Sequence, residues 1–265
     1  MEFQNLKSTL IDRQITLPNC RIFYKQGGTH SASTPILFLH GWGISTEPYQ
    51  EILELIAQQH CVIAPDLPSF ARSNYPNLIS DYDTYAKLLV SFLDALNLEQ
   101  VHLVGHSIGG GISIAINSIA VDRVKSLVLV GSTGVPKVTF PEIIPVRAIE
   151  MTAQISLPKL KLQLVDIPQV FSQNLLFNTG NVIQALLLSL EKDLRPLLPL
   201  IKAPCLLLWS EKDLTMPLDS GREMAALIPH STLVTVEEGY HEWGLWYPEK
   251  FTSIVLDFVQ QVELK

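Results

Sequence analysis

Ser107 lies in a pattern that can make its hydroxyl a nucleophile. It is the centre of Gly105-His106-Ser107-Ile108-Gly109, between an apolar, β-branched run at 101–104 and an apolar segment at 108–120. The first run predicts a buried strand and the second a helix, so the serine falls on a sharp turn between them. Such a turn crowds its flanking positions, and glycine at 105 and 109 meets that demand. The five residues alone can arise by chance in a loop, but the flanking strand and helix favour a nucleophile elbow.

A serine hydroxyl needs a base to accept its proton and a group to orient that base. His241 follows the last predicted strand, at 232–236, and Asp213 follows the strand predicted at 205–209. Both residues therefore lie at the carboxyl ends of strands, where open α/β sheets place their ligands. We predict a catalytic triad with Ser107 as nucleophile, His241 as base and Asp213 as orienting acid.

Plainer interpretations of these partners stay open. Asp213 also suits a turn or a helix cap, and His241 also suits an exposed loop. Glu237 and Glu238 are rivals to Asp213, because they lie beside the histidine loop. The remaining histidines fit the role of base less well, since they fall in hydrophilic or terminal positions, inside a strand, or beside the elbow and an early loop; they are His30, His40, His60, His102, His106 and His230.

An oxyanion hole requires two backbone N–H groups aimed at one point. One is expected from the residue after the nucleophile, and the other from the loop after an early strand. Ile108 and Trp42 occupy these positions, Trp42 in a loop of small residues that follows the strand predicted at 35–40. The Trp42 side chain is also expected to pack as a core or pocket aromatic, which is compatible because its backbone alone would donate.

Strands and helices alternate along most of the chain. Short runs on either side of Pro18 and Asn19 predict an antiparallel hairpin, and strands apolar on both faces then alternate with helices. This order predicts an α/β fold with a parallel sheet between helices. It stops at 135–200, where helix-like segments are interrupted by prolines. We therefore predict a core of residues 1–134 and 201–265 with an inserted helical cap at 135–200.

The predicted cap is rich in apolar side chains and poor in charge. Part of this apolar surface must pack on the core, and a face lying over the elbow would present the rest to a substrate. The residues concerned are Ile143, Ile144, Leu160, Leu162, Leu164, Val170, Phe171, Leu175, Leu176, Phe177 and Leu186 to Leu188.

Composition narrows the class of protein. The 265 residues suit one large domain or a domain with an insertion, and a net charge of −7 without a Lys/Arg cluster argues against nucleic acid as a partner. The first ten residues lack the apolar core of an export signal, and no apolar run reaches the length of a membrane span, so we expect a cytoplasmic protein. Cys20, Cys61 and Cys205 are widely spaced and odd in number, which favours buried thiols over a disulfide or zinc framework.

Four motifs together resemble the α/β-hydrolase superfamily of serine esterases, over the whole chain. They are His40-Gly41-Trp42-Gly43, Gly105 to Gly109, Trp209 to Asp213 and Gly239-Tyr240-His241. The resemblance implies an eight-stranded, mostly parallel sheet, with the cap inserted after the sixth strand and roofing an active site that uses neither metal nor cofactor. The segment 66–73 is similar to the family's Asp-Leu-Pro-Gly-x-Gly-x-Ser loop, but Ser69 and Ala71 replace both glycines.

The expected function is hydrolysis of a carboxylic ester with an apolar portion, through an acyl-enzyme on Ser107. The resemblance also admits carbon–carbon bond hydrolases, thioesterases, lactonases and perhydrolases, although carbon–carbon hydrolases with such a cap usually carry asparagine where this chain has His106. Haloalkane dehalogenases and epoxide hydrolases are disfavoured, because they resemble this fold with an aspartate at the position of Ser107. A slow-turnover ligand receptor and a non-catalytic relative are alternatives of other classes. The sequence indicates neither the substrate nor the oligomeric state.

Overall fold

The computed structural model describes residues 10–28, 33–155 and 166–265. The strands are β1 (Leu10–Leu17), β2 (Cys20–Gly27), β3 (Ile36–Leu39), β4 (Val62–Pro65), β5 (Val101–His106), β6 (Val124–Val130), β7 (Cys205–Ser210) and β8 (Ser231–Val236). The α-helices are α1 (Gln50–Ala57), α2 (Tyr82–Ala95), α3 (Ile108–Ile119), α4 (Phe140–Ile155), α5 (Asp166–Phe177), α6 (Thr179–Glu191), α7 (Leu218–Leu227), α8 (Trp243–Trp246) and α9 (Pro248–Glu263). Shorter 3₁₀ helices are η1 (Glu47–Tyr49), η2 (Val121–Arg123) and η4 (Arg195–Leu200).

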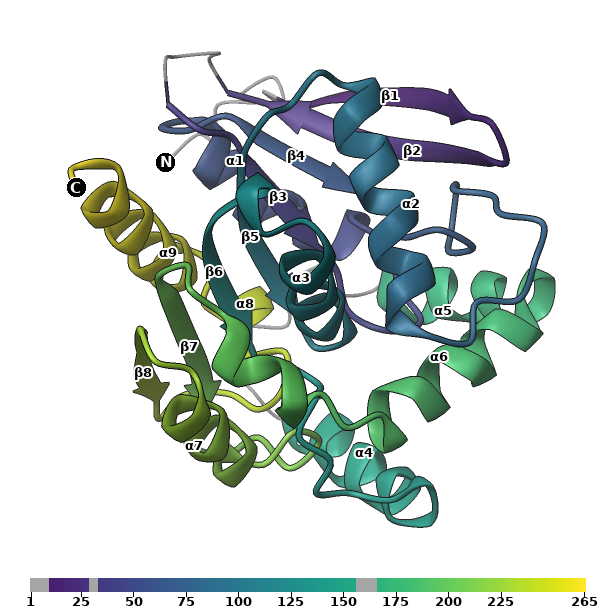
Figure 1. Cartoon of the computed structure of the whole chain (residues 1–265). Helices are drawn as coiled ribbons and strands as arrows, with labels where there is room; N and C mark the ends of the chain where they lie inside the picture. Colours follow the sequence, from purple (N-terminus) through teal and green to yellow (C-terminus); the bar gives the residue numbers. More distant parts are fainter. Residues whose placement is uncertain (1–9, 29–32, 156–165) are drawn as a thin grey trace, which may run out of the picture.

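The strands form one eight-stranded sheet in the order β1-β2-β4-β3-β5-β6-β7-β8. The hairpin of β1 and β2 is antiparallel, β2 joins β4 in antiparallel fashion, and every later pairing is parallel. The predicted fold class, an α/β protein with a mostly parallel eight-stranded sheet flanked by helices, is confirmed (Figure 1).

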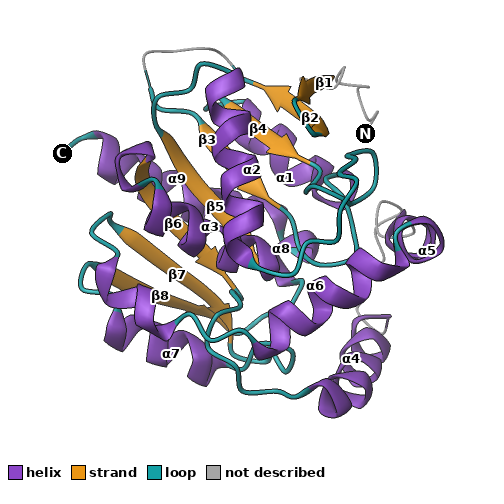
Figure 2. Ribbon diagram, turned by 45° about the vertical axis from the view of Figure 1, so that its right-hand side comes forward, coloured by secondary structure: helices purple, strands orange, loops and turns teal. Residues whose placement is uncertain are grey.

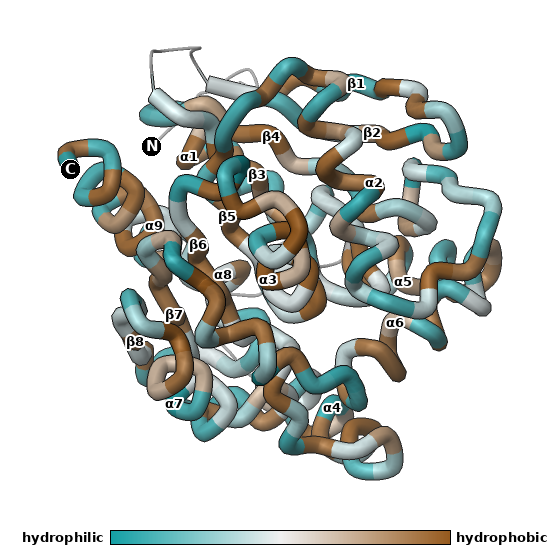
Figure 3. Tube along the Cα trace, in the orientation of Figure 1, coloured by the Kyte–Doolittle hydropathy of each residue, from teal (hydrophilic) through white to brown (hydrophobic). Residues whose placement is uncertain are grey.

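The central strands are buried on both faces, as their apolar sequences predicted (Figure 3). Alternate residues face opposite cores, so Leu103 belongs to the core cluster that includes residues of α2, α3 and α7, whereas its neighbour Val104 belongs to the cluster that includes residues of α1, α8 and α9. The carboxyl ends of β3, β5, β6, β7 and β8 therefore meet at one edge of the sheet. The loops that leave these ends carry the candidate site residues.

Helices α4, α5, α6 and η4 lie between β6 and β7 in the chain. Figure 2 shows α4, α5 and α6 gathered on one side of the sheet, at the end toward which the parallel strands point. The helices at 140–155 and 179–191 correspond to the helix-like segments seen in the sequence, whereas α5 was not predicted. Pro168, near the start of α5, interrupts the helical pattern in the sequence. Three residues of the predicted apolar set, at 160, 162 and 164, lie outside the described residues.

Within the described part of the chain, no helix combines the length and apolarity needed to cross a bilayer. Cys20, Cys61 and Cys205 are buried and free of disulfides. Burial raises the pKa of the Cys20 thiol to about 11, so this thiol is protonated at neutral pH. The cytoplasmic location stays a prediction.

Candidate active site

Ser107 stands between the end of β5 and the start of α3 in a strained backbone conformation. Its φ of 56° and ψ of −119° lie in a region that costs a non-glycine residue about 1–3 kcal/mol. Neighbouring backbone holds it there, because Ser107 N–H donates to the carbonyl of Val130 at 2.9 Å and Ser107 C=O accepts from Thr133 N–H at 3.1 Å. These two hydrogen bonds therefore hold the strained conformation of Ser107 at the carboxyl end of β5.

Gly105 and Gly109, which flank Ser107 in the elbow, leave no room for a side chain. A Cβ atom on Gly105 would lie 2.4 Å from the carbonyl oxygen of Gly109, and one on Gly109 would lie 2.3 Å from the carbonyl oxygen of Leu39. Contacts this short with backbone cannot be relieved by moving a side chain. Any larger residue at either position would push α3 away from β3 and β5.

The structure brings His241 and Asp213 together, although 28 residues separate them. His241 Nδ1 donates to Asp213 Oδ2 at 2.8 Å, and both side chains are buried. The other carboxylate oxygen, Oδ1, accepts from Met216 N–H at 2.7 Å. With Nδ1 protonated, the neutral imidazole exposes the lone pair of Nε2, which is the atom that can accept a proton from a nucleophile.

The end of β6 links this pair to Ser107. A Cβ on Gly131 would lie 3.0 Å from Asp213 Oδ2 and 3.1 Å from His241 Nδ1. Val130, the residue before that glycine, accepts the hydrogen bond from Ser107 N–H. Among the described residues, Ser107 Oγ forms no hydrogen bond with His241. In enzymes of this chemistry, the bond between nucleophile and base often tightens when the substrate is bound.

His106 supports His241 from beneath. Its Nε2 donates to the carbonyl of His241 at 3.1 Å, and its Nδ1 accepts from the hydroxyl of Tyr49 at 2.7 Å. Burial, helped by the nearby His241, lowers the pKa of His106 to about 3, so this ring is neutral. Tyr49 in turn accepts from Gly41 N–H at 3.2 Å. The sequence placed His106 beside the elbow but gave no signal for Tyr49, which meets His106 across 57 residues.

Helix α4 contacts the loops of both Asp213 and His241. Arg147 donates to Glu242 at 2.5 Å and to Glu150 at 3.0 Å. Glu150 is fully buried and accepts from the backbone N–H groups of Leu214 at 2.7 Å and Thr215 at 3.2 Å. The sequence did not single out this Arg147/Glu150 pair, because an arginine and a glutamate three residues apart usually form an exposed surface pair.

Neither glutamate proposed as a rival acid contacts the imidazole. Glu237 is exposed, and Glu238 forms an ion pair with Lys250 at 2.8 Å. The charged and titratable groups that do face His241 are Asp213, Glu242, Arg147 and His106. Burial alone would lower the pKa of His241, but the charge and hydrogen bond of Asp213 outweigh it, and the pKa is raised above 6.5.

The pH dependence of turnover should report this balance. Because His241 must be neutral to accept a proton, kcat/KM should rise with pH through a group that titrates above about 6.5. Glu242→Gln removes a negative charge that raises the pKa of His241 and should move this acid limb to lower pH. A unit charge within about 10 Å of a partly buried group shifts its pKa by roughly one unit.

Glu238 provides the matched control, because it lies on the same loop, its side chain is 39% exposed and its charge is paired with Lys250. Glu238→Gln should leave the acid limb in place. Full pH profiles of kcat/KM for the two variants and the parent check the prediction. A profile flat from mildly acidic to neutral pH, or equal shifts in both variants, would contradict it.

The two predicted oxyanion donors lie at the ends of neighbouring strands. Ile108 is the first residue of α3, and Trp42 lies in the loop after β3, which pairs with β5 in parallel register. In the described part of the chain, neither backbone N–H donates to a protein acceptor. The Trp42 ring points away into the inserted helices, where its Nε1 donates to the carbonyl of Val182 in α6 at 2.7 Å.

The loop at 66–73 keeps the conformation that glycine would favour. Ser69 has a φ of 69° and Ala71 a φ of 48°, both in the left-handed region. Each costs about 1–2 kcal/mol relative to glycine, before the entropy that glycine loses on folding is counted. Asp66 compensates by accepting from Thr46 N–H at 2.9 Å and from Arg72 Nε at 2.7 Å. Ser69 and Ala71 therefore both adopt the left-handed conformation that glycine favours.

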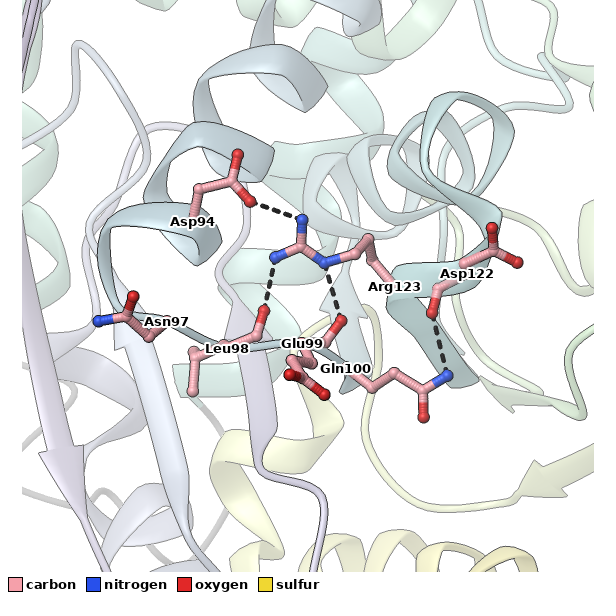
Figure 4. A pocket seen from close by; sticks show the side chains of 7 residues that line it. All are labelled: Asp94, Asn97, Leu98, Glu99, Gln100, Asp122 and Arg123. Atoms are coloured by element: carbon pink, nitrogen blue, oxygen red, sulfur yellow. Dashed lines mark hydrogen bonds and ion pairs between the residues drawn. The ribbon is translucent and has the colours of Figure 1, made fainter.

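A surface hollow elsewhere has no part in this chemistry. Its lining residues, shown in Figure 4, belong to 94–100 and 122–123 and so precede the amino-terminal ends of β5 and β6. Ser107 lies at the other end of β5. Its Arg123 is engaged by Asp94 at 2.6 Å and by the carbonyls of Leu98 and Glu99. These bonds join α2 and η2 within the fold, so the hollow is a structural junction.

Comparisons with known proteins agree with this architecture. A family model of the α/β hydrolase fold matches residues 34–152. The chain is 26% identical to the hydrolase YugF of Bacillus subtilis, over 94% of this chain and 97% of that protein. It is 28% identical to a 2-hydroxy-6-oxo-6-phenylhexa-2,4-dienoate hydrolase of Burkholderia cepacia, over 92% of each.

Among solved structures, a membrane phospholipase A described as a bacterial virulence factor has the same fold. It aligns with a TM-score of 0.83 at 24% identity, covering 97% of this chain and 87% of that one. The sheet order, the family model and these relatives lead to one conclusion: the chain has the α/β-hydrolase fold.

Proposed function

We propose that this protein is a serine hydrolase that cleaves carboxylic esters with an apolar portion through an acyl-enzyme on Ser107. The observation that carries the proposal is the buried hydrogen bond of 2.8 Å between His241 Nδ1 and Asp213 Oδ2, beside the strained Ser107. This bond fixes the tautomer that leaves His241 Nε2 as a proton acceptor. Strained backbone at a residue other than glycine is typical of a catalytic position.

In the acylation step, Ser107 Oγ attacks the ester carbonyl carbon while its proton passes to His241 Nε2. The carbonyl oxygen becomes an oxyanion, which the backbone N–H groups of Trp42 and Ile108 stabilise. The carbon–oxygen bond to the alcohol then breaks, and His241 returns the proton to the leaving oxygen. Throughout, Asp213 stabilises the transient imidazolium and keeps its ring oriented.

In the deacylation step, a water molecule replaces the alcohol. His241 takes a proton from this water as its oxygen attacks the acyl carbon, and a second oxyanion forms in the same hole. The bond to Ser107 Oγ breaks, the serine recovers the proton from His241, and the carboxylic acid leaves. No metal or cofactor is needed for either step.

We further propose that residues 135–200 act as a cap over the site and contact the apolar part of the substrate. Two observations support this role. Ile143, Val182 and Leu188 join the main core, whereas Leu176 and Phe177 remain 75% and 82% exposed. Residues 167–190 also include no charged side chain. An uncharged, partly exposed helical pair suits an ester with an acyl or alkyl chain.

Hydrolysis of a carbon–carbon bond is the second candidate. It is favoured by the 28% identity to the dienoate hydrolase of Burkholderia cepacia. His106 distinguishes this chain from the asparagine usual in that branch, and its ring is fully engaged with Tyr49 and the carbonyl of His241. For this reason the ester is preferred.

An assay of both bond types on one purified sample tests the proposal. We expect p-nitrophenyl butyrate to octanoate to be cleaved with higher kcat/KM than the acetate, because each buried methylene contributes about 0.8 kcal/mol, roughly fourfold, until the apolar site is full. The matched comparison is 2-hydroxy-6-oxo-6-phenylhexa-2,4-dienoate, followed by loss of its absorbance.

Three outcomes would contradict the proposal. Faster cleavage of the dienoate than of every ester would favour the carbon–carbon hydrolase. A steady fall from acetate upward would show a closed acyl site that takes small acyl groups. A single slow turnover with retention of the product would point to a ligand receptor.

A further inference from the structure

The loop of Trp42 is bonded to the inserted helices through both its side chain and its backbone. Phe171 of α5 meets the Trp42 ring edge-on, with the ring centroids 5.2 Å apart. Val182 of α6 accepts the indole N–H at 2.7 Å. The Trp42 side chain therefore contacts two helices of the segment between β6 and β7, α5 through a ring contact and α6 through a hydrogen bond.

A third contact consists of hydrogen bonds to the backbone that follows Trp42. Asn174 of α5 is 1% exposed, and its Nδ2 donates to the carbonyls of Gly43 at 3.0 Å and Ile44 at 3.3 Å. Its Oδ1 accepts from the N–H of Ala71 at 2.6 Å. Both the oxygen and the nitrogen of the Asn174 amide are therefore hydrogen-bonded to backbone groups, in the loops that follow β3 and β4.

Gly43 makes this contact decisive for the direction of the Trp42 peptide. Its φ is +73°, and a Cβ at this position would lie 2.8 Å from the ring of Phe171. Glycine is conformationally permissive, so the chain itself does little to fix the torsions between Trp42 and the two carbonyls. The hydrogen bonds from Asn174 supply the restraint that the backbone lacks.

We propose that Asn174 is a positioning residue of the oxyanion hole, which keeps the Trp42 N–H aimed at the reacting carbonyl oxygen as long as α5 is docked. This inference rests on the proposed function. Asn174 touches no reacting atom, and it acts through the torsions of Gly43. The hole is then complete when the cap helix is seated, so cap docking and transition-state stabilisation are coupled.

Charge stabilisation depends steeply on donor geometry, which sets the expected effect. Removing an oxyanion donor outright lowers kcat by about 10²–10³. If the Trp42 N–H is only less well oriented, the loss in kcat should be smaller than this. We therefore expect Asn174→Ala to lower kcat by about 10- to 100-fold, with KM changed by less than about threefold. Asn174→Asp keeps the acceptor for Ala71 but turns a carboxylate oxygen toward two carbonyls, and it should lose activity to a similar degree.

Asn181 offers a matched control, since its side chain forms the same kind of bond to a loop other than the oxyanion loop. Its Oδ1 accepts from Ile79 N–H at 3.1 Å, between α6 and the loop before α2. Asn181→Ala should leave kcat within about twofold of the parent. Affinity for a trifluoromethyl ketone, which adds to serine as a charged hemiketal, should fall with kcat in the Asn174 variants and hold in the control.

Thermal unfolding of each variant distinguishes a positioning effect from loss of the fold. The kinetic comparison is made at a temperature below the unfolding midpoint of every variant. Equal kcat in Asn174→Ala and Asn181→Ala would overturn the proposal, and so would a loss confined to KM. If the parent itself shows no turnover that depends on Ser107, the proposed function fails instead. The two failures are therefore distinguishable.

Discussion

Replacing Ser107 with alanine should abolish ester turnover and labelling by a fluorophosphonate probe. The probe reacts by forming a bond between serine oxygen and phosphorus with loss of fluoride, so it reports the same activated oxygen as catalysis. The fold should survive, because the backbone bonds of Ser107 to Val130 and Thr133 do not involve its hydroxyl. In-gel labelling and steady-state kinetics, with thermal unfolding as a check on the fold, measure the effect.

Ser118 is a suitable matched control for this change. It lies on α3, the helix that follows Ser107, and its hydroxyl donates to the carbonyl of Ala115 within that helix. Ser118→Ala should keep full labelling and full turnover. Residual turnover of Ser107→Ala well above background would show that another group attacks the substrate, and the assignment of the nucleophile would be wrong.

Replacing Asp213 with asparagine should lower kcat by about 10⁴-fold, the loss known from the best-studied triad. The structure gives the reason. Met216 N–H donates to Oδ1 of residue 213 at 2.7 Å, which holds the amide oxygen of the substituted residue on that side. Its NH₂ group then faces His241 Nδ1, where an acceptor is needed. The imidazole must shift its proton to Nε2 and can no longer act as a base.

The two neighbouring glutamates serve as controls for the acid. Glu237→Gln and Glu238→Gln should each leave kcat within about twofold, because neither side chain reaches the imidazole. The steady-state rate of each variant, measured on the best ester, compares them directly. A greater loss in either glutamate variant than in Asp213→Asn would show that the acid has been misassigned.

The fold and the elbow were accessible from sequence because local patterns determine them. Continuous apolar runs are typical of strands buried on both faces, and the run ending at Val104 meets a glycine-flanked Ser107. Helices α5 and α8 were missed for different reasons. The first carries a proline near its start, which interrupts the helical pattern, and the second spans four residues, too few to show a period.

The residues that support Ser107 and His241 could not be predicted in the same way, since they depend on contacts between distant segments. Glu237, Glu238 and Asp213 are equally acidic in sequence, and it is the register of β7 beside β8 that brings Asp213 to His241. The fixed tautomer of the imidazole follows from that contact. No local pattern distinguishes an acid that faces the histidine from one that faces solvent.

The sequence by itself determined the sheet, the elbow and the residue types that a serine hydrolase requires, because backbone sterics and apolar periodicity act over a few neighbouring residues. The tertiary structure alone decided which groups support them. Tyr49 meets His106 across 57 residues, and Asn174 meets the carbonyl of Gly43 across 131. A buried polar side chain must find a partner somewhere, but which partner it finds is set by how helices and sheet pack, and that information is spread over the whole chain.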